Sequence, residues 1–266
     1  MRARLAVVGG TGFDDPGLLG APVAAERVVT RFGQVALSYY HVGGDPGAVV
    51  AFLPRHGAAH GVPPHRIDYR ANFAALARAG VERIVATAAV GSLRATLAPG
   101  TLLIPDQVLD FTRSRPGTFY DEAVVHTDFT EPYCPQMREA LLRAAGRQGL
   151  SVEPAGTYAV LEGPRYETAA EVRTLALLGG DVVGMTGMPE AILAREAGMC
   201  MAVVAVVTNL GAGIAQRELS HAEVGDVMAR RRADVVRLML EALTSLPEAR
   251  ACPCSRIRAD GRPPVW

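Results

Sequence analysis

A glycine-rich segment, Gly9-Gly10-Thr11-Gly12, directly follows the apolar run Leu5–Val8. Glycines let backbone N–H groups approach an anion closely, and the Thr11 hydroxyl adds a donor, so the segment can bind a single phosphate. The dinucleotide fingerprint G-x-G-x-x-G fits poorly, because its third glycine would fall at Asp15, whose charge would repel a pyrophosphate. A tight turn without a ligand is the alternative.

Arg55 and His56 follow the next buried run, Ala48–Leu53. An arginine offers a planar fork of donors that matches phosphate bidentately, and His56 can add one more hydrogen bond. His60 and His65 lie nearby, but no carboxylate or cysteine completes a metal-ligand set at a plausible spacing. We therefore predict an anion site without a metal, with a polar surface loop as the alternative.

Two glutamates, Glu162 and Glu167, lie five residues apart around a Gly-Pro turn. In a pocket, the Glu167 carboxylate can accept hydrogen bonds from an N–H-bearing heterocycle, with Tyr166 stacking nearby. Alternatively, Glu167 is a first-turn acid that the dipole of the following helix favours. Paired glutamates also suggest glycoside hydrolysis, which needs both carboxylates on one cleft wall and gives the anion donors no role.

Two later segments end apolar runs with side chains that can contact a nucleoside. Met185 and Thr186 link an expected strand to an expected helix; methionine usually fills a core, but it can also pack on a sugar face. Asn209 ends the run Ala205–Thr208. Its amide donates and accepts, which suits the O6/N7 edge of a purine, although asparagine is also common in turns.

The elements that must position these residues alternate between short β-branched runs and helical patterns, which is typical of an α/β domain. We expect strands over 5–8, 28–31, 35–40, 48–53, 83–89, 102–109, 182–186 and 201–208, and helices over 63–80, 135–149, 168–179, 189–198 and 220–246. Ligands of α/β sheets bind at the carboxyl ends of strands. The polar strand ends are therefore expected to converge on one pocket, although some can serve only as caps.

The composition excludes several functions. The chain of 266 residues carries 27 basic and 27 acidic side chains, and every basic one is arginine. Without lysine there is no Schiff-base chemistry and no P-loop lysine. Zero net charge argues against a nucleic-acid or anionic-membrane partner. No apolar run is long enough for a signal peptide or a membrane span, so we expect a cytoplasmic protein.

Four cysteines, Cys134, Cys200, Cys252 and Cys254, are too few and too scattered for a disulfide framework. The pair Cys252-Pro253-Cys254 can be a redox clip or half a metal site, but no second Cys/His pair lies nearby in the sequence. We interpret both as ordinary thiols of an extended tail. The predicted organisation is one domain over residues 1–247 and a C-terminal tail over 248–266.

Taken together, these motifs resemble the trimeric purine nucleoside phosphorylase and methylthioadenosine phosphorylase family. The resemblance covers residues 4–246 and depends on six ordered motifs: Gly9–Gly12, Arg55–Gly57 with Pro63–Asn72, Thr87–Arg94, Glu162–Glu167, Met185–Glu190 and Thr208-Asn209. It implies a single α/β domain with a mixed, barrel-like central β-sheet surrounded by helices, assembled as a homotrimer or a dimer of trimers. The implied reaction is pentosyl transfer from a purine nucleoside to phosphate, which yields free base and ribose 1-phosphate with no metal or organic cofactor.

The resemblance also implies a phosphate site in which inorganic phosphate, the co-substrate, is held by Thr11, Arg55, His56, the Ala89 backbone N–H and Thr186. Ala88 departs from the pattern, because some relatives supply a hydroxyl or an amide there. Met185 matches the residue that packs under the ribose.

The base site separates the branches of this family. Adenine-specific relatives have serine near position 167 and aspartate at 209 and 211, whereas this chain has Glu167, Asn209 and Gly211. Glu167 can accept from N1–H of hypoxanthine or guanine, and Asn209 can donate to O6 and accept from N7–H of the departing base. This resembles the 6-oxopurine branch, which acts on inosine and guanosine. Catalytic roles are implied for Asn209, Glu167 and His56.

The 5′ position is the second discriminator. Methylthio-specific relatives place an apolar residue where this chain has His221, and the 6-oxopurine branch places a histidine over the 5′-hydroxyl. A histidine that caps a helix start is the alternative. His126 resembles part of the segment that a neighbouring subunit lends to this pocket. The competing functions are phosphorolysis of S-methyl-5′-thioinosine or S-methyl-5′-thioadenosine, hydrolysis by water, and a purine nucleoside-sensing module without turnover, for which Ala88 is the one supporting feature.

Overall fold

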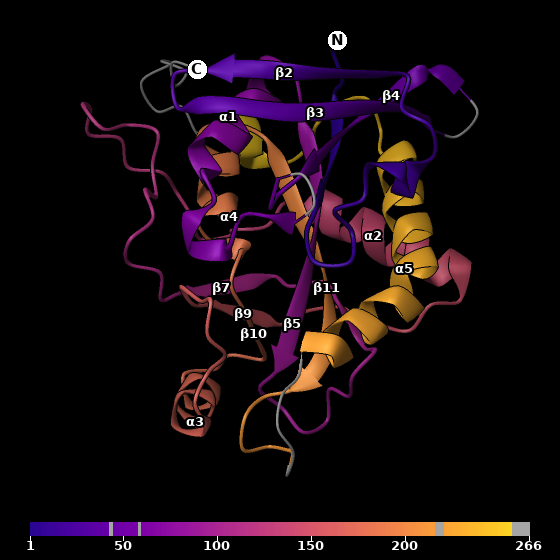
Figure 1. Ribbon diagram of the computed structural model, residues 1–266. Helices are drawn as coiled ribbons and strands as arrows, with labels where there is room; N and C mark the ends of the chain where they lie inside the picture. The colour runs from indigo at the N-terminus through magenta and orange to yellow at the C-terminus, as the bar shows by residue number, and fades with distance from the viewer. Residues whose placement is uncertain (43–44, 58–59, 216–220, 257–266) are drawn as a thin grey trace.

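The computed structural model describes residues 1–42, 45–57, 60–215 and 221–256. Within these residues, eleven strands join in one mixed sheet with helices packed around it (Figure 1). The strands are β1 (Leu5–Gly9), β2 (Ala24–Thr30), β3 (Gly33–Val42), β4 (Asp45–Pro54), β5 (Arg83–Ser92), β6 (Leu102–Leu103), β7 (Gln107–Asp110), β8 (Val152–Glu153), β9 (Thr157–Val160), β10 (Val182–Gly184) and β11 (Cys200–Leu210). The helices are α1 (Tyr69–Arg78), α2 (Pro135–Gln148), α3 (Ala169–Leu177), α4 (Gly187–Glu196) and α5 (His221–Thr244), with 3₁₀ turns η1 (Pro16–Leu19), η3 (Pro64–Arg66) and η4 (Pro253–Arg256).

Strand β5 is the centre of the sheet. It pairs in parallel with β1 over its first half and with β11 along its length, and it pairs in antiparallel with β10 near its end. Strand β4 is also parallel to β1. The carboxyl ends of β4, β1, β5 and β11 therefore lie at the same edge of the sheet. The arrowheads of β5 and β11 mark this edge in Figure 1.

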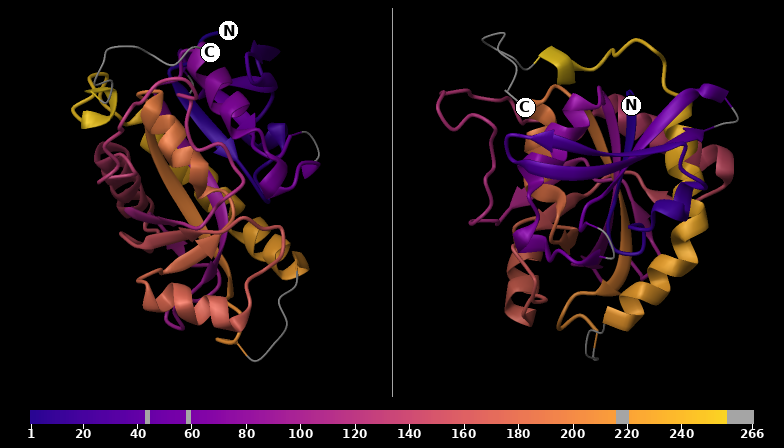
Figure 2. Two further views of the ribbon diagram at one scale, coloured as in Figure 1. Left: turned by 90° about the vertical axis from the view of Figure 1, so that its left-hand side faces the viewer. Right: turned by 45° about the horizontal axis from the view of Figure 1, so that its top comes forward.

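The core lies on both faces of this sheet. Along β1, Ala6 and Val8 pack into one apolar cluster and Val7 into the other, because successive side chains of a strand point to opposite faces. Helices α1 and α4 contribute to the first cluster, and α2 and α5 contribute to the second. Figure 2 shows these helix pairs on opposite sides of the strands. The predicted fold class, one α/β domain with a mixed central sheet surrounded by helices, is confirmed.

Local departures from the expected elements have local causes. The strand expected over 102–109 is two strands, because Pro105 cannot donate to a sheet ladder; β6 pairs with β11 and β7 with β9. The helix expected from position 63 begins only at Tyr69, since Asp68 Oδ1 accepts a hydrogen bond from the Ala71 N–H at 2.9 Å and caps it. Strands β8 and β9 were not predicted.

The segment after α5 packs on the domain. Arg83 Nη2 donates to the carbonyl oxygens of Pro247 and Glu248 at 2.6 and 3.0 Å. The expectation that Cys252 and Cys254 lie in an extended tail is wrong, because both side chains are buried, with exposed fractions of 5% and 1%. In the part of the chain that the structure describes, no helix combines the length and the apolar composition that a membrane crossing needs.

Candidate active site

A cavity of about 340 Å³ lies where the predicted site residues converge. Its wall includes residues that follow β1, β4 and β10 and residues near the carboxyl ends of β5 and β11. Its volume is in the usual range for small-molecule sites. Nine of the predicted site residues line it: Thr11, Arg55, His56, Ala89, Tyr166, Glu167, Met185, Thr186 and Asn209. The expectation that polar strand ends meet in one pocket is met for these residues.

The Arg55 guanidinium is buried and already paired. Its Nε and Nη2 donate to the two carboxylate oxygens of Glu190, the latter at 2.9 Å, and Nη1 donates to the Thr87 carbonyl at 2.9 Å. Burial by itself lowers the pKa of Arg55, but the Glu190 charge outweighs it and raises the pKa. The Nε/Nη2 side of the guanidinium therefore holds Glu190, and one N–H group on Nη1 and one on Nη2 remain for an anion.

The glycine-rich segment makes room for this arginine. A Cβ on Gly10 would lie 2.2 Å from Arg55 Nη1, so only glycine fits there. The Phe13 N–H donates to the Gly10 carbonyl at 2.7 Å, and Gly12 has a positive φ of 75°. The segment is thus a tight turn, and it also places Thr11 on the cavity wall.

His56 is fixed in one tautomer. Its Nδ1 lies 2.8 Å from the Val62 carbonyl oxygen, which can only accept, so Nδ1 carries the proton and Nε2 has the free lone pair. Burial and the Arg55 charge lower the pKa of His56 to about 4. At neutral pH, His56 is therefore an uncharged acceptor at Nε2, not the additional donor that the sequence suggested.

The other two histidines of this region have different positions. The His60 ring lies 4.2 Å from the His56 ring, and its Nδ1 lies 3.0 Å from Asp14 Oδ2. His60 lines the cavity, whereas His65 does not. Within the described residues, the three histidines do not form a metal-ligand cluster.

Glu167 precedes α3 without capping it. Thr168 is the N-cap, and it forms a capping box with Glu171, so Glu171 is the first-turn acid of this helix. The alternative role for Glu167 as a dipole-favoured first-turn acid is therefore wrong. Glu167 faces the cavity beside Tyr166, and burial raises the pKa of its carboxyl.

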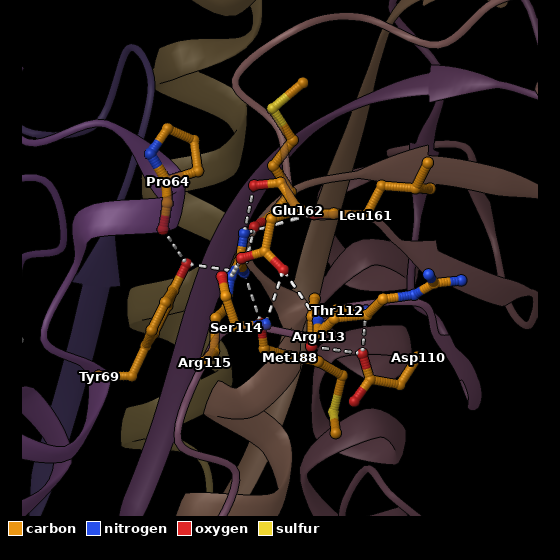
Figure 3. A network of polar contacts seen from close by, with 11 residues as sticks. Pro64, Tyr69, Asp110, Thr112, Arg113, Ser114, Arg115, Leu161, Glu162 and Met188 are labelled. Carbon is orange, nitrogen blue, oxygen red and sulfur yellow. Dashed lines mark hydrogen bonds and ion pairs between the residues drawn. The ribbon is translucent and has the colours of Figure 1, made fainter.

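Glu162 belongs to a separate hydrogen-bond network. Its carboxylate accepts from the Arg113 and Ser114 backbone N–H groups at 2.8 and 3.2 Å and from Arg115 Nε at 2.9 Å (Figure 3). Although burial opposes the charge, these donors lower the pKa of Glu162 to about 2. Glu162 lines a separate hollow, so the two glutamates do not face one cleft, and the geometry contradicts glycoside hydrolysis.

Arg115 is a supporting residue that the sequence did not reveal. Its buried Nη1 donates to the carbonyl oxygens of Met185 and Met188, both at 2.7 Å, and to the Tyr69 hydroxyl at 3.0 Å (Figure 3). Its Nη2 donates to the Glu162 carbonyl at 2.6 Å. Arg115 thereby ties the segment after β9 to the segment after β10. An arginine in a loop between Ser and Pro carries no local signal of such a role.

A β-bulge sets the position of Asn209. The register of β11 against β5 shifts between Val207 and Asn209, and bulges re-aim side chains. Asn209 Nδ2 donates to the Leu210 carbonyl at 3.1 Å, and Oδ1 accepts from the Thr208 hydroxyl at 2.9 Å. A Cβ on Gly91 would lie 3.1 Å from Nδ2, so the neighbouring strand is also shaped around this amide.

Comparisons with known proteins agree with this geometry. A model of the phosphorylase superfamily matches residues 4–244. The chain belongs to the phosphorylase superfamily. It is 50% identical over 260 residues to a 6-oxopurine nucleoside phosphorylase from Pyrococcus furiosus, covering 94% of this chain and 96% of that protein. It is 46% identical over 254 residues to a protein from Methanopyrus kandleri named probable S-methyl-5′-thioinosine phosphorylase, covering 95% and 96%.

A solved methylthioadenosine phosphorylase has the same fold. Methylthioadenosine phosphorylase from Schistosoma mansoni, in complex with adenine, superposes with a TM-score of 0.86 at 32% identity and covers 91% of each chain. The family that the sequence motifs indicate, the nucleoside phosphorylases, is therefore confirmed.

The resemblance assigns His221 and His126 to the superfamily's 5′ pocket, and the structure describes only one of these two side chains. The side chain of His221 lies outside the described residues, but Val224, one turn later on α5, lines the cavity. His126 is exposed and lines a separate hollow with Thr118 and Glu196. Within one copy of the chain, His126 therefore does not reach the site.

Proposed function

We propose that this phosphorylase-superfamily protein catalyses phosphorolysis of 6-oxopurine nucleosides, inosine and guanosine, to free base and ribose 1-phosphate. The observation that carries the proposal is that Glu167 and Asn209 line the same cavity. A carboxylate beside an amide matches N1–H, O6 and N7 of a 6-oxopurine. Adenine instead presents an acceptor at N1, which would oppose the Glu167 carboxylate.

The hydrogen bonds of Asn209 leave the right capacity for this contact. One of its two amide hydrogens serves Leu210, and one of the two Oδ1 lone pairs serves Thr208. One donor remains for O6 and one acceptor for N7–H. The base leaves with the electron pair of the glycosidic bond and takes up a proton at N7, and hydrogen phosphate supplies the balancing proton as it becomes a phosphate monoester. Asn209 stabilises the leaving group by accepting from this N7–H.

Phosphate would bind through dipoles more than through net charge. Glu190 balances Arg55, and His56 is neutral. The remaining donors on the cavity wall are the two free N–H groups of Arg55 and the hydroxyls of Thr11 and Thr186. The His56 Nε2 lone pair suits the hydroxyl of a hydrogen phosphate ion, which can donate to it.

The reaction is a displacement at C1′ with oxocarbenium character. Bound phosphate is both the nucleophile and the countercharge of the cationic sugar, held close to C1′. Glu167 fixes the base through N1–H, and Met185 packs under the ribose. The reaction needs neither a metal nor an organic cofactor.

We also propose a homotrimer or a dimer of trimers in the cytoplasm. A neighbouring copy that supplies His126 to the 5′ side would give this exposed residue a partner and would complete the pocket near Val224. His221 would contact the 5′-hydroxyl from the start of α5.

S-methyl-5′-thioinosine phosphorolysis is the second candidate. It keeps the same base contacts and differs only at the 5′ position, and the apolar Val224 on the cavity wall favours it. S-methyl-5′-thioadenosine is disfavoured by Glu167 and Asn209.

The test separates these substrates directly. The purified protein is incubated with inosine, guanosine, S-methyl-5′-thioinosine, adenosine or S-methyl-5′-thioadenosine, with and without phosphate, and the free base is measured by chromatography. Hypoxanthine from inosine only with phosphate supports the proposal. A dominant S-methyl-5′-thioinosine activity keeps the base-site argument and overturns the His221 one, whereas dominant adenine release overturns the base site. Binding without any turnover would identify a sensing module.

A further inference from the structure

The four cysteines of the chain meet in one buried cluster. Cys134 lies just before α2, Cys200 begins β11, and Cys252 and Cys254 follow α5. Their exposed fractions are 1%, 1%, 5% and 1%. All four Sγ atoms lie within 4.8 Å of one another, and Cys200 Sγ is 3.3 Å from Cys252 Sγ. Three segments that span 120 positions of the chain thus bring four thiols to one point.

This spacing matches a tetrahedron of thiolates around an ion. Zinc binds four cysteines at about 2.3 Å, which places the sulfur atoms about 3.8 Å apart. A disulfide needs about 2.05 Å between sulfur atoms, and all four cysteines are free. A Cys-x-Cys pair with two further cysteines supplies a complete four-sulfur ligand set, with no position left for substrate or water.

We propose that Cys134, Cys200, Cys252 and Cys254 bind one Zn²⁺ ion as a closed, structural site. Zinc binding would replace the four thiol protons with four Zn–S bonds and release those protons to solvent. Cys134 lies at the N-terminus of the 14-residue helix α2, where the helix dipole favours a thiolate.

Hydrogen bonds of the backbone and of one arginine side chain hold the three segments in place independently of the sulfur atoms. The Cys134 N–H donates to the Met201 carbonyl at 2.8 Å, and the Cys200 N–H donates to the Glu82 carbonyl at 2.8 Å. Arg250 Nη1 donates to the Gly198 carbonyl at 2.8 Å, just before the Cys252 segment. The ligands are therefore preorganised, which reduces the conformational entropy that ion binding has to overcome.

The zinc site and the cavity lie at opposite ends of β11. Cys200 begins this strand, and Asn209 is its second-last residue, about 30 Å away along an extended strand. The ion would fasten the chain after α5 to β11 and to the start of α2. It would stabilise the fold without contacting the substrate, so this inference does not depend on the proposed function.

Metal analysis tests the site directly. The full chain is produced with zinc in the medium, purified with a reductant and without chelators, and analysed by mass spectrometry for metals. We expect one zinc per chain. Replacement by Co²⁺ is expected to give the thiolate-to-cobalt charge-transfer band and the visible bands of a tetrahedral four-sulfur site.

Variants in the same segment provide the control. Cys252→Ser with Cys254→Ser removes two ligands, and we expect loss of bound zinc and of the cobalt spectrum. Ala251→Ser with Ser255→Ala changes the same segment without touching a thiol and is expected to keep both. Removal of zinc from the unsubstituted chain by a chelator should lower Tm by roughly 5 °C or more.

Two results would overturn the zinc proposal. If the reduced chain took up no zinc from an equimolar solution and gave no cobalt spectrum, the proposal would be overturned. Disulfides among these cysteines in protein isolated under the same reducing conditions, found by alkylation and mass measurement, would also overturn it. A zinc-loaded protein without any phosphorolysis would leave the zinc site established and would count only against the proposed function.

Discussion

Replacing Glu190 by glutamine would test whether the charge of Arg55 is held by this one carboxylate. Both side chains are buried, with side-chain exposures of 2% and 1%. Glu190→Gln keeps the shape and one acceptor oxygen, but it turns the second oxygen into an N–H₂ group that faces an Arg55 donor. The variant therefore leaves a buried guanidinium without a counter-ion.

The expected loss of stability follows from the loss of one partner of a buried ion pair. Removing one partner of a buried ion pair costs about 3–5 kcal/mol. Because the amide retains one hydrogen bond, we expect the lower end, about 3 kcal/mol, which corresponds to a fall in Tm of roughly 6–12 °C in a chain of this size. Phosphate should partly restore this stability, since a dianion in the cavity would meet the unpaired charge. We expect phosphate to bind the variant at least about tenfold more tightly, equivalent to about 1.4 kcal/mol.

The assay is thermal unfolding over a series of phosphate concentrations, compared with Asp234→Asn. Asp234 pairs with Arg231 and Arg237 at the surface, where loss of an ion pair costs about 1 kcal/mol or less. If Glu190→Gln lowered Tm no more than Asp234→Asn, and phosphate stabilised both equally, the assignment of the Arg55 charge to Glu190 would be refuted.

Three further predictions concern other parts of the site. Asn209→Asp should lower kcat/KM for inosine by on the order of 10²-fold and that for adenosine by much less, since O6 loses its donor; an equal loss for both in parallel assays would contradict the base-site argument. Arg115→Met should cost about 3 kcal/mol in urea unfolding and raise KM for the nucleoside, because the Met185 segment loses its support; unchanged stability would count against it. The pKa of His56 is lowered in the folded chain, so the unfolded chain binds the extra proton and stability should fall as pH drops from about 6.5 to about 4. His56→Gln should flatten this part of the Tm profile, and an identical profile would contradict the assignment.

The fold class could be predicted because strand-forming and helix-forming sequence patterns alternate along most of the chain. Apolar runs of β-branched residues bounded by glycine mark β1, β4, β5 and β11 well. The short strand β9, Thr157–Val160, was missed because four residues are too few to show a period. The start of α1 was misplaced because prolines at 63 and 64 fit a first turn, and the capping role of Asp68 was overlooked.

The candidate site was predictable in its members but not in its charge state. Arg55, His56, Glu167 and Asn209 all line the cavity, as their places after strands and the resemblance indicated. Their partners come from distant positions: Glu190 is 135 residues from Arg55. Spacing along a chain cannot show which acid will neutralise which arginine, and the difference decides whether phosphate meets a free cation or a set of dipoles.

Strand β11 shows the same limit at both of its ends. Its sequence is apolar from Cys200 to Val207, and ten of its eleven residues are buried. The features with chemical meaning are the bulge at Thr208, which turns Asn209 toward the cavity, and the contact of Cys200 with three cysteines from other segments. Both depend on the strand's neighbours, β5 in one case and the chain before α2 and after α5 in the other. A cysteine that looks isolated in the sequence therefore becomes informative only once the pairing of the sheet is known, and the same is true of the single asparagine at the other end.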